Sequence, residues 1–174
     1  MPAPYDRRVP SIRFARPTDA ATIESIENDA DQLLVERLRP GSWPPAAAGA
    51  DRLAEPGFLL VVALDDEAVV GFAHVVEADG LCHLEQLSVR PEHSRRGLGR
   101  RLVTATAEHA RLIGYERITL RTYADVPWNA PFYRSAGFFE EEPVTAFHRS
   151  HVETEHRLGL DRYGRRLQMA TDLT

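Results

Sequence analysis

The sequence predicts a mixed α/β fold in which helices flank a mostly antiparallel sheet. Three strand-like runs follow one another closely, and they occupy 58–64, 69–77 and 81–89. The Asp79-Gly80 pair before the third run is typical of a β-hairpin. A glycine-rich turn then leads into residues 98–113, where apolar side chains recur at helical spacing. We therefore expect an antiparallel meander that ends in a strand, a turn and a helix.

The chain before the meander is expected to supply a strand, a helical region and a loop. Residues 12–14 have the pattern of a short strand, and Asp19 is a capping candidate for helical spacing that reaches about residue 38. Proline and glycine are frequent in 40–49, which predicts an irregular loop that could close over a site. A tight turn is expected at 65–67.

The chain after the long helix is expected to return to the sheet. The predicted elements are a strand at 117–122, a short helix at 129–136, a strand at 138–141, a helix at 145–158 and a return strand at 165–171. Gly137 and Gly159 follow the two helices, where glycine often ends a helix. A length of 174 residues fits one domain spanning 1–174.

Composition favours a protein of a reducing compartment. The net charge is −5, so no general attraction to nucleic acid is expected, and every basic residue is arginine. Cys82 is the single cysteine, which excludes an internal disulfide. We expect no targeting segment, and no apolar run approaches the ~18 residues of a membrane span. The expectation is a cytoplasmic protein with neither a nucleic acid nor a membrane partner.

An anion cradle is predicted at the turn before the long helix, where the sequence reads Arg95-Arg96-Gly97-Leu98-Gly99-Arg100-Arg101. The first N–H groups of a helix have no partner within it, and glycine lets an anion approach the backbone closely. Arginines at a helix N-terminus conflict with the macrodipole, and a bound polyanion would relieve that conflict. A solvated, arginine-rich helix start is the alternative for this segment alone.

Two common phosphate-binding motifs fail at this turn. A P-loop requires a lysine, and the chain has none. The dinucleotide fingerprint G-x-G-x-x-G needs a third glycine where this chain has Leu102, and it belongs to a βαβ unit instead of a meander. The sequence therefore disfavours a nucleotide-binding α/β protein.

Two segments together resemble the GNAT superfamily of N-acetyltransferases. Leu87-Ser88-Val89, Pro91 and the x-x-G-x-G at 95–99 look like its acyl-coenzyme A signature. Asn129-Ala130-Pro131-Phe132-Tyr133, followed by Gly137-Phe138, is similar to its second conserved block. The order of elements agrees over about 12–142, with 143–174 as a helix plus a return strand. The resemblance implies a GNAT fold, with six to seven strands splayed at the acyl-coenzyme A site.

The resemblance also implies acetyl-coenzyme A as co-substrate. Its pyrophosphate would be held by the glycine turn, through Arg95, Arg96, Gly97, Leu98, Gly99 and Arg100. Its pantetheine arm would pair with the backbone of Leu87, Ser88 and Val89, where an N–H would polarise the thioester carbonyl. Asn129 is a further candidate contact. Ser94 departs from the Gln or Arg with which the family signature usually begins.

Glu85 is the leading candidate for a catalytic base, because an amine of pKa ~10 must lose a proton to attack an acyl group. Strand alternation is expected to place His83, Glu85, Leu87 and Val89 on one face, near the backbone that would hold the thioester. His83 ranks second, since an imidazole of pKa ~6.5 suits proton transfer at neutral pH. The alternatives are a salt-bridged carboxylate and a histidine packed on the sheet.

Tyr133 falls at the position of the family's general acid, where a phenol would protonate the departing thiolate. The alternative is a tyrosine that packs in the core.

In the resembled family the first helix and the following loop form the substrate wall, which makes Glu27 and Trp43 candidate substrate contacts. Asp29 and Asp31 add to the acidity of this region and favour a cationic acceptor.

Two other groups of side chains have structural interpretations. Cys82 adjoins His83, but neighbours on a strand face opposite sides, so a buried structural cysteine is expected. A second group near the C-terminus lacks the H-E-x-x-H spacing of a zinc site. Its members are His148, His151, Glu153, Glu155 and His156. We expect these residues to form a solvated helix face, and no metal is predicted.

The sequence thus predicts an N-acetyltransferase that moves an acetyl group from acetyl-coenzyme A to a primary amine by direct attack in a ternary complex. The amine could belong to a small molecule or to a protein or peptide. A non-catalytic acyl-coenzyme A binding module that senses or regulates is the alternative. A C-terminal hairpin could support a homodimer.

Overall fold

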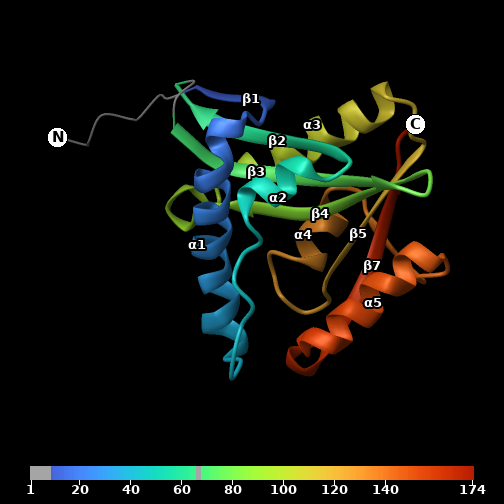
Figure 1. The fold of residues 1–174 in the computed structure, drawn as a ribbon. Coiled ribbons are helices and arrows are strands. Elements are labelled where there is room, and N and C mark those ends of the chain that lie inside the picture. Colours follow the sequence, from blue (N-terminus) through green and yellow to red (C-terminus); the bar gives the residue numbers. More distant parts are fainter. Residues whose placement is uncertain (1–8, 66–67) are drawn as a thin grey trace.

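A computed structural model describes residues 9–65 and 68–174 (Figure 1). Within these residues, seven strands form one sheet in the order β1-β2-β3-β4-β5-β7-β6, and all neighbours are antiparallel except β4 and β5. The strands are β1 (Pro10–Phe14), β2 (Gly57–Leu64), β3 (Ala68–Ala78), β4 (Leu81–Val89), β5 (Arg117–Tyr123), β6 (Phe139–Glu141) and β7 (Arg166–Asp172). The helices are α1 (Ala20–Leu38), α2 (Gly49–Ala54), α3 (Leu98–Leu112), α4 (Ala130–Ser135) and α5 (Ala146–Leu158), with short 3-10 turns at Pro17–Asp19, Pro91–His93 and Leu160–Tyr163. The predicted mixed α/β fold is confirmed.

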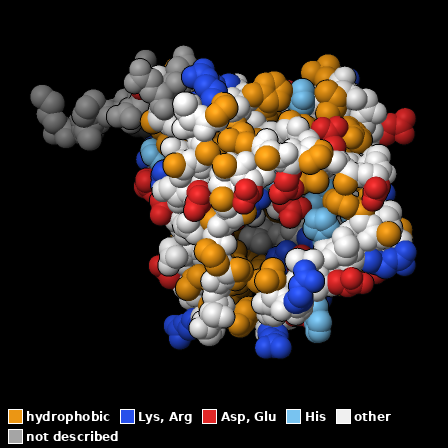
Figure 2. Space-filling model, in the orientation of Figure 1, with side chains coloured by type: hydrophobic (Ala, Val, Ile, Leu, Met, Phe, Trp, Pro, Cys, Tyr) orange, Lys and Arg blue, Asp and Glu red, His pale blue; other side chains and the backbone are white. Residues whose placement is uncertain are grey.

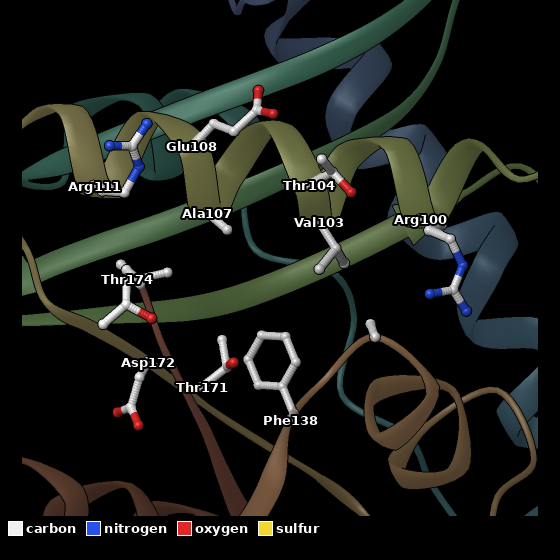
Figure 3. A pocket seen from close by; sticks show the side chains of 12 residues that line it. Arg100, Val103, Thr104, Ala107, Glu108, Arg111, Phe138, Thr171, Asp172 and Thr174 are labelled. Atoms are coloured by element: carbon white, nitrogen blue, oxygen red, sulfur yellow. The ribbon is translucent and has the colours of Figure 1, made fainter.

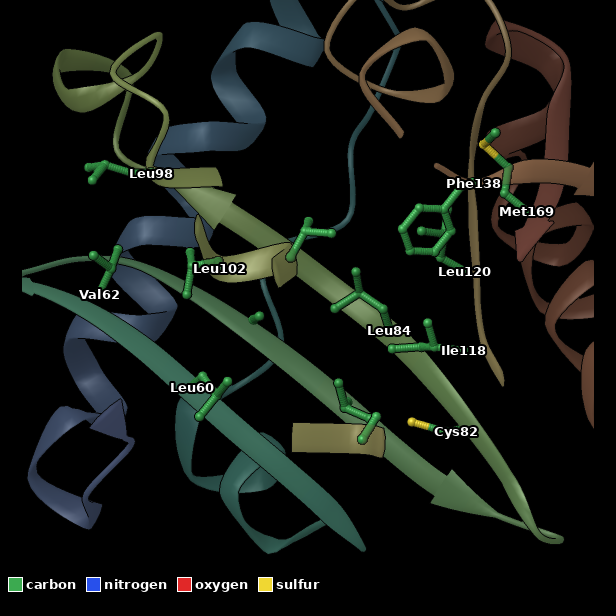
Figure 4. Close-up of a cluster of buried hydrophobic side chains, with 14 of the residues drawn as sticks. Leu60, Val62, Cys82, Leu84, Leu98, Leu102, Ile118, Leu120, Phe138 and Met169 are labelled. Atoms are coloured by element: carbon green, nitrogen blue, oxygen red, sulfur yellow. The ribbon is translucent and has the colours of Figure 1, made fainter. Parts of the chain in front are cut away.

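Helices cover both faces of the sheet. On one face α3 packs on a large buried apolar cluster (Figure 4), which includes Leu60, Val62, Leu84, Leu102, Ile118, Leu120, Phe138 and Met169. On the opposite face α1 places Ile23 and Ile26 against Val61 and Phe72. This division gives the sheet one face covered by α3 and another face covered by α1.

The helix α5 lies on the same side of the sheet as α1. It contacts Thr119 and Arg121 of β5, whereas the alternating residues Ile118 and Leu120 point into the cluster under α3. The two helices stand apart in Figure 1, with α1 beside β1–β3 and α5 beside β5 and β7. The strand between these two regions is β4.

A β-bulge interrupts β4 at Glu85. The pairing with β3 joins His74 to Gln86 but Val75 to Leu84, so Glu85 is an extra residue on β4. A bulge reverses which face the following side chains occupy. The two halves of β4 therefore present their odd-numbered residues to opposite faces.

The bulge corrects the predicted arrangement of side chains on β4. His83 and Glu85 approach one another on the face shared with α5, but Leu87 and Val89 pack on the α3 cluster on the other face. The prediction that all four share one face is therefore wrong for the last two. Cys82 is buried in the α3 cluster, as expected, and burial raises the pKa of its thiol to about 12.

The sheet opens between β4 and β5. These strands pair only as His83 with Thr119 and Leu84 with Leu120, although β4 continues to Val89 and β5 to Tyr123. Beyond the paired positions, the β4 edge that faces β5 has no strand partner within the described residues. We call this opening the β4–β5 wedge, and it is the splayed sheet that the resemblance implies.

Most predicted elements lie within two residues of their observed bounds. The helix α2 is an exception, because the sequence shows no helical spacing over its six residues. The predicted turn at 65–67 lies partly outside the described residues. The return strand β7 is not an edge strand of the sheet, because it lies between β5 and β6. Within the described ranges, no helix has the length and apolarity needed to cross a membrane.

Candidate active site

A hollow opens on the face that carries α1, α2 and α5 (Figure 2), and acidic and histidine side chains stand at its border. Glu85 lies among these elements. Its carboxylate interacts electrostatically with Glu27 of α1, with Glu55 just after α2 and with His151 of α5. We call the space between α1, α2 and α5 the acceptor cleft.

Glu85 is joined to α5 by a hydrogen bond with His151. Its Oε2 lies 3.0 Å from Nε2 of His151 and 3.9 Å from Nε2 of His83. The second ring nitrogen of His151, Nδ1, lies 3.1 Å from the carbonyl oxygen of Phe147 one helical turn earlier. Both ring nitrogens of His151 thus face acceptors, which favours the doubly protonated imidazolium.

The charges of this group follow from its contacts. Burial by itself would raise the pKa of Glu85, but the hydrogen bond with His151 and the nearby histidines lower it to about 2. The hydrogen bond with Glu85 raises the pKa of His151. Burial lowers the pKa of His83 to about 3, so this ring is neutral at physiological pH. Glu85 therefore remains an anion beside an imidazolium.

A chain of polar side chains holds His83 from behind. The hydroxyl oxygen of Thr119 lies 2.7 Å from Nδ1 of His83 and 3.0 Å from Nε2 of His148. Nδ1 of His148 lies 2.9 Å from the hydroxyl oxygen of Thr145, which also accepts the backbone N–H of His148 as the cap of α5. This chain connects β4, β5 and the start of α5.

The structure corrects the prediction that the histidines and glutamates of α5 form a solvated face. His148 and Glu155 are only 4% and 8% exposed, and His151 contacts Glu85. Glu153 and His156 are exposed, as predicted. The prediction failed because the buried face of α5 is polar, and ion pairs leave no apolar periodicity in a sequence.

The turn at the start of α3 has the backbone geometry expected of the predicted anion cradle. Within the described residues, no backbone N–H from 95–100 donates a hydrogen bond to the chain, and the first helical bond is from Arg101 N–H to the Gly97 carbonyl. Arg95 and Gly97 have φ angles of 60° and 77°, and such left-handed residues turn successive N–H groups toward one concave side. The side chains of Arg95 and Arg96 have no polar partner in the described part of the chain. The cradle therefore offers free donors and free positive charge together.

The helix α4 is fixed between the cradle and β5. Asn129 accepts hydrogen bonds from the Thr122 hydroxyl at 2.8 Å and from the Tyr123 N–H at 3.3 Å. Arg100 donates to the backbone and hydroxyl oxygens of Ser135, at 3.1 and 2.6 Å. Both residues were expected to contact coenzyme A, and the structure uses these groups to hold α4 at the mouth of the β4–β5 wedge.

Tyr133 lies on α4 with its ring against Phe132 and Phe138, at centroid distances of 5.1 and 5.6 Å. Its hydroxyl makes no hydrogen bond with the described residues. Burial raises the pKa of Tyr133 above its usual value. The phenol therefore keeps its proton at neutral pH and has no internal acceptor for it.

The wall of the acceptor cleft contains Glu27 and Trp43 in different roles. Glu27 is 6% exposed, and both of its oxygens accept from Arg52, at 3.0 and 2.8 Å. Trp43 donates its Nε1–H to Asp31 at 3.3 Å, and its ring lies 6.5 Å from that of Tyr163 after α5. Burial raises the pKa of Asp31 to about 6. Glu27 is thus occupied inside the protein, whereas Trp43 spans the two sides of the cleft.

A separate groove of about 340 Å³ lies between α3 and the end of β7 (Figure 3). Val103, Ala107, Phe138 and Thr171 are among the residues that line it. Because none of its lining residues belongs to β4 or α5, this groove is distinct from the site around Glu85.

A model of the acetyltransferase (GNAT) family matches residues 23–138, which is more than half of the chain. The chain belongs to this family. The chain is therefore an acyltransferase, and the alternative of a non-catalytic binding module is disfavoured. Members of this family act on amines. This GNAT acetyltransferase has their fold and both motif regions.

Solved structures agree with this fold. The ribosomal-protein-S18-alanine N-acetyltransferase from Escherichia coli matches with a TM-score of 0.68 and 19% identity, over 95% of each chain. The PaiA N-acetyltransferase from Thermoplasma acidophilum, in complex with coenzyme A, matches with a TM-score of 0.67 and 14% identity, over 94% of this chain and 99% of its own. A GNAT family acetyltransferase from Brucella melitensis, in complex with acetyl-coenzyme A, matches with a TM-score of 0.54 and 24% identity, over 76% and 84%.

His151 is the site residue that sequence reasoning missed. It lies in α5, beyond the residues 23–138 that match the family model, so no family motif marks it. A local signal was nevertheless present. His148 and His151 are three residues apart, a spacing that places both on one side of a helix.

Proposed function

We propose that this GNAT acetyltransferase moves an acetyl group from acetyl-coenzyme A to a primary amine that enters the acceptor cleft. The observation that carries the proposal is the Glu85 carboxylate, which is held as an anion by His151 next to the β4–β5 wedge. Glu85 and Asp31 favour a cationic amine, on a small molecule or on a protein or peptide. We expect direct attack in a ternary complex, in the cytoplasm.

The residues present fit acetyl-coenzyme A. The free N–H groups of 95–100 and the side chains of Arg95 and Arg96 match the charge and the acceptor oxygens of a pyrophosphate. The unpaired edge of β4 beyond Leu84 offers backbone groups at Leu87–Val89 for the pantetheine amides. The complexes of two structural neighbours with coenzyme A or acetyl-coenzyme A support this assignment.

When bound, acetyl-coenzyme A supplies a thioester whose C–S bond breaks as the C–N bond to the amine forms. Glu85 attracts the ammonium group and orients its nitrogen. Because the pKa of Glu85 is about 2, its carboxylate is a weak base toward a free ammonium of pKa ~10. One proton must therefore leave the ammonium group for water before attack, because the nitrogen needs a lone pair to form the C–N bond. Glu85 takes up the second proton as this bond forms, when the nitrogen becomes far more acidic.

The protons balance through two residues. The ammonium nitrogen loses two protons on its way to the amide. The first goes to water before attack, and the second goes to Glu85, which later passes it to water. Tyr133 donates its phenolic proton to the thiolate sulfur and regains a proton from water, so one proton is released overall. His151 and His83 are positioning residues in this scheme, because they fix the Glu85 carboxylate. Glu27 supports the cleft wall through Arg52.

Acetyl-coenzyme A is expected to raise the Tm of the protein, whereas nicotinamide and adenine nucleotides are not. Changing both Arg95→Gln and Arg96→Gln is expected to weaken the Kd for acetyl-coenzyme A roughly tenfold, because two exposed charge contacts are lost. Arg111→Gln removes one positive charge from the far end of α3 and serves as the control for a change of charge away from the cradle. The absence of any shift with coenzyme A species would contradict the cofactor assignment.

Tyr133→Phe is expected to lower kcat for thiol release by about 10²-fold, since the variant keeps the ring but lacks the proton donor. Its KM for acetyl-coenzyme A should stay near the parent value. Both constants are obtained from the rate of thiol release, which a thiol-reactive dye reports for each amine of a panel. Tyr115→Phe removes a phenol that is bonded to Glu77 and is the matched control. Equal kcat in the parent and Tyr133→Phe would exclude the acid role.

A further inference from the structure

Three side chains bring metal-binding atoms together beside the acceptor cleft. His83, Glu85 and His151 each offer one ligand atom, a ring nitrogen or a carboxylate oxygen, and these three atoms lie within 4.8 Å of one another. The Glu85 oxygen is 3.0 Å from one of these nitrogens and 3.9 Å from the other. In a tetrahedral Zn²⁺ site, bonds of about 2.0–2.2 Å place neighbouring ligand atoms about 3.3 Å apart. The two distances from Glu85 lie on either side of this separation, and the third is no more than 4.8 Å.

Both histidines are oriented through the ring nitrogen that does not face Glu85. Nδ1 of His83 lies 2.7 Å from the Thr119 hydroxyl oxygen, and Nδ1 of His151 lies 3.1 Å from the Phe147 carbonyl oxygen. Hydrogen bonds of this kind orient the ring of metal-binding histidines. For His151 the carbonyl can only accept, so Nδ1 carries a proton and Nε2 is the nitrogen left for a metal ion.

The hydrogen bonds behind His83 can run in either direction, and one direction leaves a ring nitrogen of His83 free for a metal ion. Nδ1–H of His83 donates to the Thr119 hydroxyl, which donates to Nε2 of His148, whose Nδ1–H donates to Thr145. This assignment leaves Nε2 of His83 as a lone pair on the side of the Glu85 carboxylate. Two electron-rich atoms at this distance are stabilised by a cation between them.

We infer that His83, Glu85 and His151 form a binding site for a divalent first-row metal ion, with Zn²⁺ as the best fit. Two imidazoles and one carboxylate are donors that Zn²⁺ takes, and three protein ligands leave a fourth position for water or a ligand. Binding releases to solvent the proton that joins His151 to Glu85. A metal ion bound at this site occupies the Glu85 carboxylate and blocks acetyl transfer. This effect on acetyl transfer rests on the proposed function, whereas the metal binding itself does not.

The test uses Co²⁺ as a spectroscopic substitute for Zn²⁺ on the full-length protein. One equivalent of Co²⁺ is expected to give the visible absorption of a four-coordinate site, and Zn²⁺ is expected to abolish it by displacement. Glu85→Gln and His151→Gln should each weaken Co²⁺ affinity by at least about tenfold. His156→Gln removes an exposed histidine of the same helix, bonded to Asp161, and should bind Co²⁺ like the parent.

Stabilisation of each variant by acetyl-coenzyme A verifies that it is folded, independently of turnover. The absence of Co²⁺ absorption in the parent, or unchanged Co²⁺ affinity in either variant, would overturn the site. If the parent protein binds Co²⁺ yet acetylates amines equally well with the metal bound, the metal site stands. Only the proposed role of Glu85 in acetyl transfer is then contradicted.

Discussion

Glu85→Gln is expected to lower kcat/KM for amine acetylation by about 10²- to 10⁴-fold, the range for loss of a general acid or base. Glutamine has the same shape, but it carries no charge to attract an ammonium group and accepts no proton as the C–N bond forms. The Kd for acetyl-coenzyme A should not change, because the cradle at 95–100 is built from another part of the chain. Thiol release at saturating acetyl-coenzyme A, measured over a range of amine concentrations, gives kcat/KM.

The control for this experiment is Glu55→Gln. Glu55 is an exposed carboxylate whose charge acts on Glu85, so the variant measures the effect of removing one negative charge from the same region. We expect a much smaller loss of kcat/KM than in Glu85→Gln. Similar losses in the two variants would show that Glu85 contributes only general electrostatic attraction, and an unchanged Glu85→Gln would exclude it from the chemistry.

The fold was largely predictable because its elements carry strong local signals. The Asp79-Gly80 turn, the apolar spacing of α3 and the glycines after α4 and α5 each mark an element or its end. The bulge at Glu85 has no such signal, because an extra residue in a strand depends on its pairing partner. A strict alternation therefore placed Leu87 and Val89 on the wrong face.

The candidate site was predictable where it coincides with family motifs and not elsewhere. The free N–H groups of the cradle follow from a glycine turn at a helix start, which is a local property. The contact of His151 with Glu85 joins residues that are 66 positions apart, and it depends on how α5 docks on β5. Long-range docking of a helix through polar groups leaves no periodic trace in the sequence.

The docking of α5 depends on Glu155, and Glu155→Ala is expected to destabilise the protein by about 3–5 kcal/mol, the cost of breaking a buried ion pair. The Glu155 carboxylate accepts two hydrogen bonds from Arg121, both at 2.9 Å, and one from Arg166 at 2.7 Å. Without Glu155, two largely buried guanidinium groups lose their counter-charge. For a chain of this size we expect a fall in Tm of roughly 10 °C. Glu153→Gln, on the exposed side of the same helix, should change stability by no more than about 0.5 kcal/mol.

The effect of Glu155 should also depend on pH. Burial tends to raise the pKa of Glu155, but the hydrogen bonds from Arg166 and Arg121 outweigh burial and hold it below its usual value of 4.5. A carboxyl whose pKa is lowered by folding stabilises the protein above its unfolded pKa, and this stabilisation is lost as the pH falls through the folded pKa. Urea unfolding of the parent and Glu155→Ala should therefore differ most near neutral pH and converge in acid. A large stability difference that does not change with pH would mean that Glu155 acts through packing. A difference near zero at every pH would show that α5 is held without Glu155.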